Sequence, residues 1–252
     1  MIIRDKVFVI TGAARGLGFA FAEDLAQAGG RLALVDLNAE GLEQAANLLR
    51  QQGAEVRVYA ANVSSEEEVT ALFDDVQRDF GGIDCLINNA GITRDSLLVK
   101  RKGDEVQTMT KSDWQQVIDV NLTGVFLCGR EAASRMVQAN CQGVIVNVSS
   151  ICRNGNIGQS NYSAAKAGVS ALTSTWGKEL VRYGIRVGAI APGFVNTEMV
   201  QQIRPDVLDK IKALIPLGRL AEPKEVAHTA RYIIENDYFT SRTISLDGGF
   251  RL

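Results

Sequence analysis

Histidine is nearly absent from this chain, and cysteine is scarce. The only histidine, His228, falls in a helical pattern late in the chain and far from every candidate site, so we expect it to be structural or exposed and not catalytic. The cysteines lack metal-ligand spacing, and at least two fall in apolar runs typical of a core. They are Cys85, Cys128, Cys141 and Cys152. We therefore expect reduced thiols, a cytoplasmic location and no metal site.

Long apolar runs and an excess of one charge are also lacking. No run approaches the roughly 18 residues that span a bilayer, and an apolar strand follows the first residues so closely that no signal peptide is expected. The 27 basic and 29 acidic residues are interspersed and give a net charge of −2. Without a strong field of either sign, neither nucleic acid nor a membrane is an expected partner.

Short apolar runs alternate with helical patterns along the whole chain, and no linker interrupts them. The expected strands cover residues 7–10, 32–36, 56–60, 85–87, 144–148, 186–191 and 243–246. The expected helices cover residues 20–28, 39–52, 64–80, 114–139, 162–183, 197–214 and 223–235. This alternation predicts an α/β fold with one domain over residues 1–252, a doubly wound parallel sheet of about seven strands with helices on both faces.

The first strand runs into glycines spaced Gly12-x-x-x-Gly16-x-Gly18 and then into a helix. The general dinucleotide pattern G-x-G-x-x-G is absent, but this spacing still lets the backbone approach a pyrophosphate at the positive end of a helix. The second strand ends in Asp36, 18 residues after Gly18, near the spacing at which a carboxylate binds the adenosine ribose. The competing interpretation is that Asp36 caps the next helix.

Later strands also end in residues suited to a ligand site. Asn62 and Val63 follow the third strand and could flank an adenine, and residues 88–91 follow the fourth, although ordinary loop chemistry explains either pair. The fifth strand delivers Ser149 to its carboxyl end, and the sixth ends at Pro192. Ligands of open parallel sheets bind at this edge.

Tyr162 and Lys166 lie four residues apart, with small side chains between them, so a helix places both on one face. A tyrosine used as an acid or base near neutral pH needs a pKa shift of roughly 3 units, or about 4 kcal/mol. A fixed lysine charge supplies much of this shift. The alternative for an isolated pair is a surface Tyr and Lys on an amphipathic helix.

With all of these motifs in order, the chain resembles the short-chain dehydrogenases/reductases over essentially its whole length. Within that family it is most similar to the 3-oxoacyl-[acyl-carrier-protein] reductases, notably in residues 190–199, 216–219 and 247–249. The resemblance implies a Rossmann-type fold and an NAD(P)-dependent oxidoreductase that interconverts a ketone and a secondary alcohol by hydride transfer, without a metal.

The resemblance also implies the catalytic roles. Tyr162 would protonate the carbonyl oxygen, and Ser149 would hydrogen-bond it. Lys166 would hold the nicotinamide ribose and lower the pKa of Tyr162, and Asn121 would position a water that links Lys166 to solvent.

The cofactor contacts follow from the same resemblance. Phosphates would contact Gly12, Arg15, Gly16, Leu17 and Gly18; the adenosine ribose would contact Asp36; the adenine would contact Asn62 and Val63. The ribose side would contact Asn89, Ala90 and Gly91. The nicotinamide would contact Pro192, Gly193, Val195 and Thr197, with Tyr162 and Lys166 also bound to the cofactor.

Asp36 and Arg15 favour different cofactors. Asp36 would bind free ribose hydroxyls and repel a 2′-phosphate, and Leu37 offers no compensating charge, whereas Arg15 could neutralise a phosphate. We give more weight to Asp36 and predict that NAD(H) is favoured over NADP(H).

For the substrate, the resemblance favours reduction of 3-oxoacyl thioesters on acyl-carrier protein or coenzyme A. The alternatives are an NAD-dependent dehydrogenase of a sugar, polyol or other secondary alcohol, and a non-catalytic dinucleotide-binding sensor. The intact Ser149, Tyr162 and Lys166 argue against a sensor.

Three further expectations concern the surface. The polar segment 99–113 carries Lys100, Arg101 and Lys102, which could meet a carrier protein or the phosphates of coenzyme A, unless the segment is merely solvated. Segment 197–214 could close over the site as a lid. The family resemblance favours a homotetramer built from the helices within 121–139 and 162–183, with residues 248–250 at a second interface.

Overall fold

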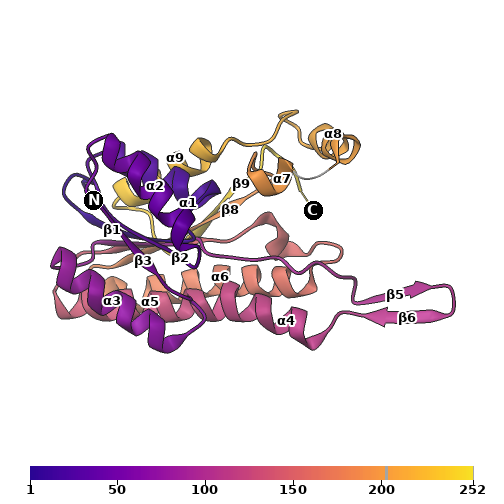
Figure 1. Ribbon diagram of the computed structural model, residues 1–252, viewed down its shortest axis with the longest axis horizontal. Coiled ribbons are helices and arrows are strands. Elements are labelled where there is room, and N and C mark those ends of the chain that lie inside the picture. The colour runs from indigo at the N-terminus through magenta and orange to yellow at the C-terminus, as the bar shows by residue number, and fades with distance from the viewer. Residues whose placement is uncertain (202–203, 252) are drawn as a thin grey trace.

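The computed structural model describes residues 1–201 and 204–251 and places one parallel sheet at the centre of the chain (Figure 1). Within these residues the sheet has seven strands in the order β3-β2-β1-β4-β7-β8-β9. The strands are β1 (Val7–Thr11), β2 (Arg31–Asp36), β3 (Val56–Ala60), β4 (Cys85–Asn88), β7 (Val144–Val148), β8 (Arg186–Pro192) and β9 (Arg242–Leu246). The predicted doubly wound α/β fold is confirmed. Because the order reverses at β1, a crevice opens beyond the carboxyl ends of β1 and β4.

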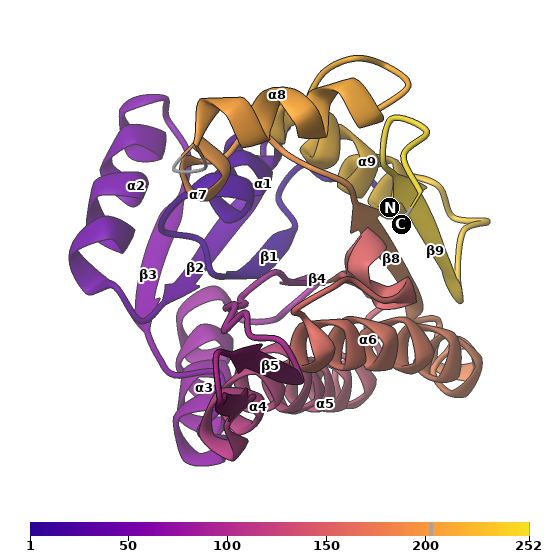
Figure 2. The ribbon, with the colours of Figure 1, turned by 90° about the vertical axis from the view of Figure 1, so that its right-hand side faces the viewer.

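Helices cover both faces of the sheet (Figure 2). On one face lie α1 (Gly16–Gln27), α2 (Ala39–Gln51) and α9 (Pro223–Glu235). On the other lie α3 (Glu66–Phe80), α5 (Gly124–Gln138) and α6 (Ser160–Glu179). Alternation along β1 divides the core between the faces, because Phe8 and Ile10 belong to one buried cluster, while Val7 and Val9 belong to the other.

Helix ends follow local chemistry where the sequence offers it. The N-cap of α3 is Ser65, whose side chain accepts a hydrogen bond from Glu68 N at 3.3 Å. The helix stops at Gly81, which takes φ +82°. The helix expected over 162–183 ends earlier, at Glu179, and a short 3₁₀ turn, Val181–Tyr183, follows it.

The helix expected over 114–139 is not regular. It consists of α4 (Lys111–Ile118), a π-helical turn (Asp119–Thr123) and α5. Asn121 lies in the π turn and is completely buried. A π turn adds a residue to the helical circuit, which hydrophobic periodicity does not reveal.

The polar segment 99–113 contains a hairpin that the sequence did not predict. Strands β5 (Val99–Lys102) and β6 (Glu105–Thr108) pair antiparallel around Gly103, which takes φ +62°. The hairpin projects from the body of the molecule (Figure 1), and every residue of both strands is exposed. Without a buried face it lacks the alternating pattern by which a strand is recognised.

The remaining features concern the surface and the thiols. Segment 197–214 forms α7 (Glu198–Gln201) and α8 (Pro205–Leu214), with residues 202–203 outside the described part. His228 is exposed, as expected, and all four cysteines are free. In the described ranges, no helix has the length and apolar character to cross a bilayer, and no three His, Cys, Asp or Glu residues cluster as metal ligands.

Candidate active site

A cavity of about 630 Å³ opens at the carboxyl ends of the central strands. Of the predicted site residues, Gly18 and Asn121 do not line it. The others do: Gly12, Arg15, Gly16, Leu17, Asp36, Asn62, Val63, Asn89, Ala90, Gly91, Ser149, Tyr162, Lys166, Pro192, Gly193, Val195 and Thr197. Residues from separate parts of the chain therefore meet in one place.

The glycine turn is packed so closely that side chains would not fit. A Cβ on Gly18 would lie 2.0 Å from Gly12 O, and one on Gly12 would lie 2.9 Å from the Cα of Ala90. Gly16 differs, because its added Cβ would meet only Thr197 Cγ2, at 4.0 Å. Gly12 and Gly16 also take φ +66° and +58°, which favours glycine at both positions.

The loop after β4 is fastened to this turn. The Thr11 hydroxyl accepts hydrogen bonds from Asn89 N at 3.0 Å and Ala90 N at 3.1 Å. The Asn89 side chain donates to Thr11 O at 3.0 Å. Thr11 is thus a buried positioning residue that our sequence reasoning did not select.

Asp36 ends β2 and faces the glycine turn. Its carboxylate accepts from Ala14 N at 3.1 Å and from Asn38 N at 3.0 Å. Arg15 also lines the cavity and pairs with Glu198 at 3.6 Å, and both of these side chains are exposed. The rim therefore presents a carboxylate held by backbone donors and an arginine already beside an acid.

The other strand ends complete the cavity. Asn62 forms a local turn by accepting from Ser64 N at 3.0 Å, and Val63 packs over Gly124. Gly193 N donates to Leu246 O at 2.8 Å, and a Cβ on Gly193 would lie 2.9 Å from the Cα of Asp247. This close approach fixes the path of the chain from β8 toward Val195 and Thr197.

Tyr162 and Lys166 lie together on α6, with Lys166 Nζ 5.6 Å from the centre of the Tyr162 ring. Lys166 is 3% exposed and donates to Val148 O at 2.8 Å. Burial lowers the pKa of Lys166 to about 8. Burial also raises the pKa of Tyr162 to about 12, with a contribution in the same direction from Cys152, while a hydrogen bond with Ser150 lowers it.

The direction of the Tyr162 shift corrects one expectation. We expected the Lys166 charge to lower the pKa of Tyr162, but its pKa is raised. The physical reason is that both groups are removed from water, which disfavours the phenolate, while the ammonium is directed to the Val148 carbonyl. The phenol is therefore held in its neutral, proton-donating form.

The structure also separates the two serines that follow β7. Ser149 Oγ donates to Lys166 O at 2.8 Å and lies 3.0 Å from Ser170 Oγ, so its hydrogen bonds are made with α6. Ser150, which was not selected from the sequence, accepts from Cys152 N at 3.1 Å, and it is the serine that lowers the pKa of Tyr162 through a hydrogen bond. Alternation was the available signal, since Asn147 and Ser149 fall on the same face of the strand and Ser150 falls on the other.

Asn121 does not line the cavity, but it holds Ile92, which does. Its side chain accepts from Ile92 N at 2.8 Å and donates to Ile92 O at 2.9 Å. Both ends of the amide are thus used to hold the loop that leads from β4 into the cavity wall.

The cavity fits a nicotinamide dinucleotide. The turn between β1 and α1 has no room for a Cβ at Gly12 or Gly18, the N–H groups at the start of α1 are suited to bind a phosphate, and Asp36 can accept from ribose hydroxyls. A fold and a site of this kind define a dinucleotide-dependent oxidoreductase.

Comparisons with known proteins agree. A family model described as enoyl-(acyl carrier protein) reductase matches residues 12–251. The chain is 39% identical to the 3-oxoacyl-[acyl-carrier-protein] reductase FabG of Thermotoga maritima over 252 residues, which cover 99% of each chain. It is 37% identical to the (3R)-3-hydroxyacyl-CoA dehydrogenase of Canis lupus familiaris over 258 residues, which cover 98% of this chain and 96% of that one. The chain belongs to the short-chain dehydrogenase/reductase family, and the resemblance inferred from its motifs is confirmed.

Proposed function

We propose that the protein reduces the keto group of 3-oxoacyl thioesters to a 3-hydroxyacyl group, with NADH favoured over NADPH. The observation that carries this proposal is the grouping of Tyr162, Ser150 and Lys166 in the cavity at the carboxyl edge of the sheet. Two relatives whose names specify 3-oxoacyl-[acyl-carrier-protein] or 3-hydroxyacyl-CoA substrates support the choice of substrate.

In the proposed reaction a bound nicotinamide dinucleotide supplies the hydride. Tyr162 gives its hydroxyl proton to the carbonyl oxygen, for which its neutral form is required. Ser150 takes the role first given to Ser149 and donates a hydrogen bond to the same oxygen, where negative charge develops. Lys166 holds the ribose and, when charged, favours the phenolate that remains after proton transfer.

Asn121 is still proposed to position the water that delivers protons, but through its backbone and not through its side chain. Because its side chain is engaged with Ile92, the contact to a water would come from the backbone of the π turn, where carbonyls lack the usual i+4 partner. The water would link Lys166 to solvent and restore the proton that Tyr162 gives up.

The preference for NADH rests on charge at the cavity rim. Asp36 would accept from free ribose hydroxyls but repel a 2′-phosphate, and the ion pair with Glu198 reduces the charge that Arg15 offers to that phosphate.

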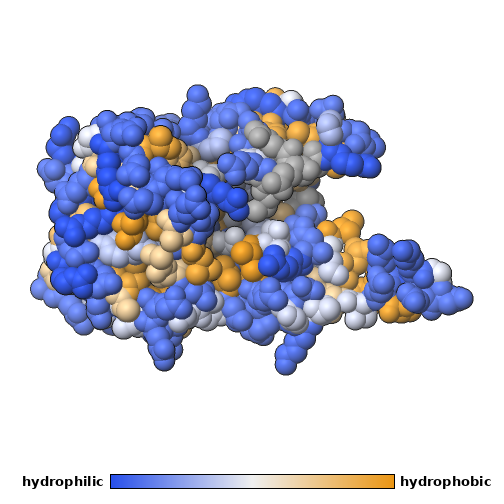
Figure 3. Space-filling model, in the orientation of Figure 1, coloured by the Kyte–Doolittle hydropathy of each residue, from blue (hydrophilic) through white to orange (hydrophobic). Residues whose placement is uncertain are grey.

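The hairpin is the proposed contact for the charged part of the thioester. Arg101 lies 3.9 Å from Asp104, and Lys102 is opposite Glu105, whereas Lys100 is opposite the neutral Gln107. We expect Lys100 to contribute most to attraction of an acidic carrier or a phosphate. Hydrophilic residues cover most of the projecting arm in the view of Figure 3.

A homotetramer formed through α5 and α6 remains our proposal. It is supported by the exposed residues Ala164, Ala167 and Ala171 along α6, whose small side chains permit close helix packing. The second interface is expected at residues 248–250. Light scattering that gives a 27.3 kDa monomer would contradict this assembly.

Turnover tests the proposed function directly. Acetoacetyl-CoA and acetoacetyl-carrier protein are compared with a panel of polyols and simple secondary alcohols, each with both cofactors. Reduction of a thioester supports the proposal. Oxidation of a polyol but no thioester would favour the alternative dehydrogenase, and cofactor binding with no turnover would favour the sensor.

A further inference from the structure

Asn161 stands directly before Tyr162 on α6 and is completely buried. Its Nδ2 donates to Arg94 O at 3.0 Å and to Asp113 O at 3.1 Å. Its Oδ1 accepts from Tyr162 N at 2.8 Å. A single amide therefore joins the helix that carries Tyr162 to both ends of the segment 94–113.

The segment held in this way is continuous with the wall of the cavity. It continues from Ile92 and Thr93, which line the cavity, and it contains the projecting hairpin. A second, outer contact lies close by, because Ser96 N donates to Gly158 O at 2.8 Å. The segment is thus joined to the start of α6 by two contacts, one buried at Asn161 and one farther out at Ser96.

The buried amide has no simple substitute. The N-cap of α6, Gln159, makes no capping hydrogen bond, so Asn161 Oδ1 satisfies one of the first N–H groups of the helix. Its two N–H donors satisfy two backbone carbonyls from distant positions. Without the Asn161 amide, the carbonyls of Arg94 and Asp113 would lose these hydrogen bonds. The cavity wall could then shift relative to Tyr162.

We infer that Asn161 is a positioning residue for the reaction: it clamps the segment 94–113 to α6 and so fixes the wall against which the substrate lies relative to the Tyr162 hydroxyl. The inference rests on the proposed role of Tyr162, but it does not depend on which ketone is reduced. It assigns no chemical step to Asn161.

The test is Asn161→Ser, whose hydroxyl can still accept from Tyr162 N but cannot reach both carbonyls. A shift of the wall by a fraction of an ångström is expected to raise the substrate KM and lower kcat, each by about tenfold. The dissociation constant for NADH, measured by fluorescence, should stay within about twofold, because Thr11 and Asn89 hold the cofactor side independently.

Asn147→Ser is the matched control. Asn147 is also completely buried and donates its amide to Thr173 at 2.9 Å, but it has no bond to the segment 94–113. This variant should lose thermal stability without the change in KM. If Asn161→Ser leaves KM and kcat unchanged, or weakens NADH binding as much as turnover, the inference is wrong.

A second variant keeps Asn161 and removes the arm. Replacing residues 99–108 by two glycines removes the proposed contact for charged thioesters but leaves both clamped carbonyls in place. Ethyl acetoacetate is small and uncharged and does not use that contact, so its kcat should stay within about twofold of the wild type, whereas KM for a charged thioester should rise. A loss as large as that of Asn161→Ser would show that the arm, and not the clamp, positions the wall. If the wild type reduces no thioester, the proposed function fails separately, and the same variants are compared on whichever ketone or alcohol the wild type does convert.

Discussion

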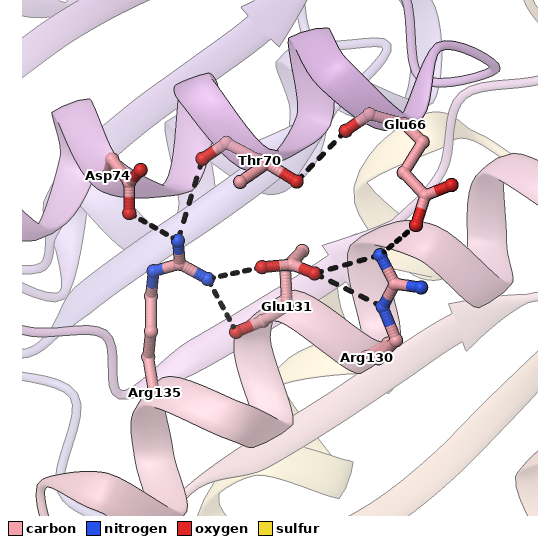
Figure 4. A network of polar contacts seen from close by, with 6 residues as sticks. All are labelled: Glu66, Thr70, Asp74, Arg130, Glu131 and Arg135. Atoms are coloured by element: carbon pink, nitrogen blue, oxygen red, sulfur yellow. Dashed lines mark hydrogen bonds and ion pairs between the residues drawn. The ribbon is translucent and has the colours of Figure 1, made fainter.

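Charged groups are arranged in opposite ways in two regions of this molecule. Between α3 and α5, Arg135 lies 2.6 Å from both Asp74 and Glu131, and Arg130 lies 2.8 Å from Glu66 (Figure 4). Burial raises the pKa of Glu131, but hydrogen bonds from Arg135 and Arg130 outweigh it and lower that pKa overall. In the active site, by contrast, Lys166 is buried beside a phenol and a backbone carbonyl, and its pKa falls to about 8.

The ion pairs between α3 and α5 stabilise the fold, whereas the charge on Lys166 is proposed to act in the reaction. Paired groups keep their ordinary ionisation, since each partner stabilises the charge of the other. A buried ammonium without a carboxylate is costly, and such groups concentrate at functional sites. Six substitutions, grouped into five predictions, test this contrast.

The largest effect is expected for Tyr162→Phe. Removal of the only proposed proton donor should lower kcat by roughly 10²–10⁴-fold, while NADH binding stays within about twofold. Steady-state kinetics and fluorescence titration measure the two quantities. Turnover close to that of the wild type would remove the proposed mechanism.

Lys166→Met should separate activity from stability. The lowered pKa of Lys166 means that the unfolded chain binds more protons between pH 8 and 10.5, so the stability of the wild type should rise with pH across that range. Removing the ammonium should raise the free energy of unfolding at pH 7 by up to about 3 kcal/mol, while activity is lost. Denaturant unfolding at several pH values measures both trends, and a less stable variant at pH 7 would contradict the cost assigned to this charge.

The two serines provide a matched pair. Ser150→Ala should lower kcat by about 10²-fold, because a hydrogen bond to the developing oxyanion is lost. Ser149→Ala should lower kcat by less than about tenfold and cost about 1 kcal/mol of stability, since its bonds to α6 are structural. The reverse order of kcat effects would restore the original choice of Ser149.

Asp36→Ala extends the comparison to a carboxylate held by backbone donors. The ratio of kcat/KM for NADH to that for NADPH should fall by about tenfold, since repulsion of the 2′-phosphate is removed. A wild type that prefers NADPH would contradict the assignment before any variant is made.

The smallest effect on activity is expected for Arg135→Met, in the paired region. Loss of two partly buried ion pairs should cost about 1–2 kcal/mol of stability and leave kcat within about twofold. The cost should shrink in high salt, because Asp74 is mostly exposed. A large loss of activity would mean that the α3–α5 face communicates with the site.

The sequence predicted best what depends on local pattern. Apolar runs identified all seven strands of the sheet, and the ends of those strands brought nearly all the proposed residues to one cavity. The sequence says least where tertiary context decides, as in our proposal that Ser150 takes the role first given to Ser149. Ser149 and Ser150 are chemically identical, and only the face that each occupies after β7 distinguishes them.

The hairpin and the π turn were missed for related reasons. Both strands of the hairpin are exposed, so selection for burial leaves no periodic signal in them. The π turn leaves an apparently continuous helical pattern on both sides of Asn121, and its presence depends on how α4 and α5 each contact the rest of the molecule.

The π turn sets the rotation of α5 about its axis relative to α4. Val117 is the buried residue of α4, while Gly124 and Val125 begin the buried face of α5. Deletion of one residue within Asp119–Thr123 would rotate everything downstream by about 100°, because a regular helix has about 3.6 residues per turn. Gly124 would then turn away from Val63, and a bulkier neighbour would take its place beneath the cavity wall. The extra residue thus sets the angular register of α5 against the sheet, and a shorter, more regular helix would be the wrong one for this fold.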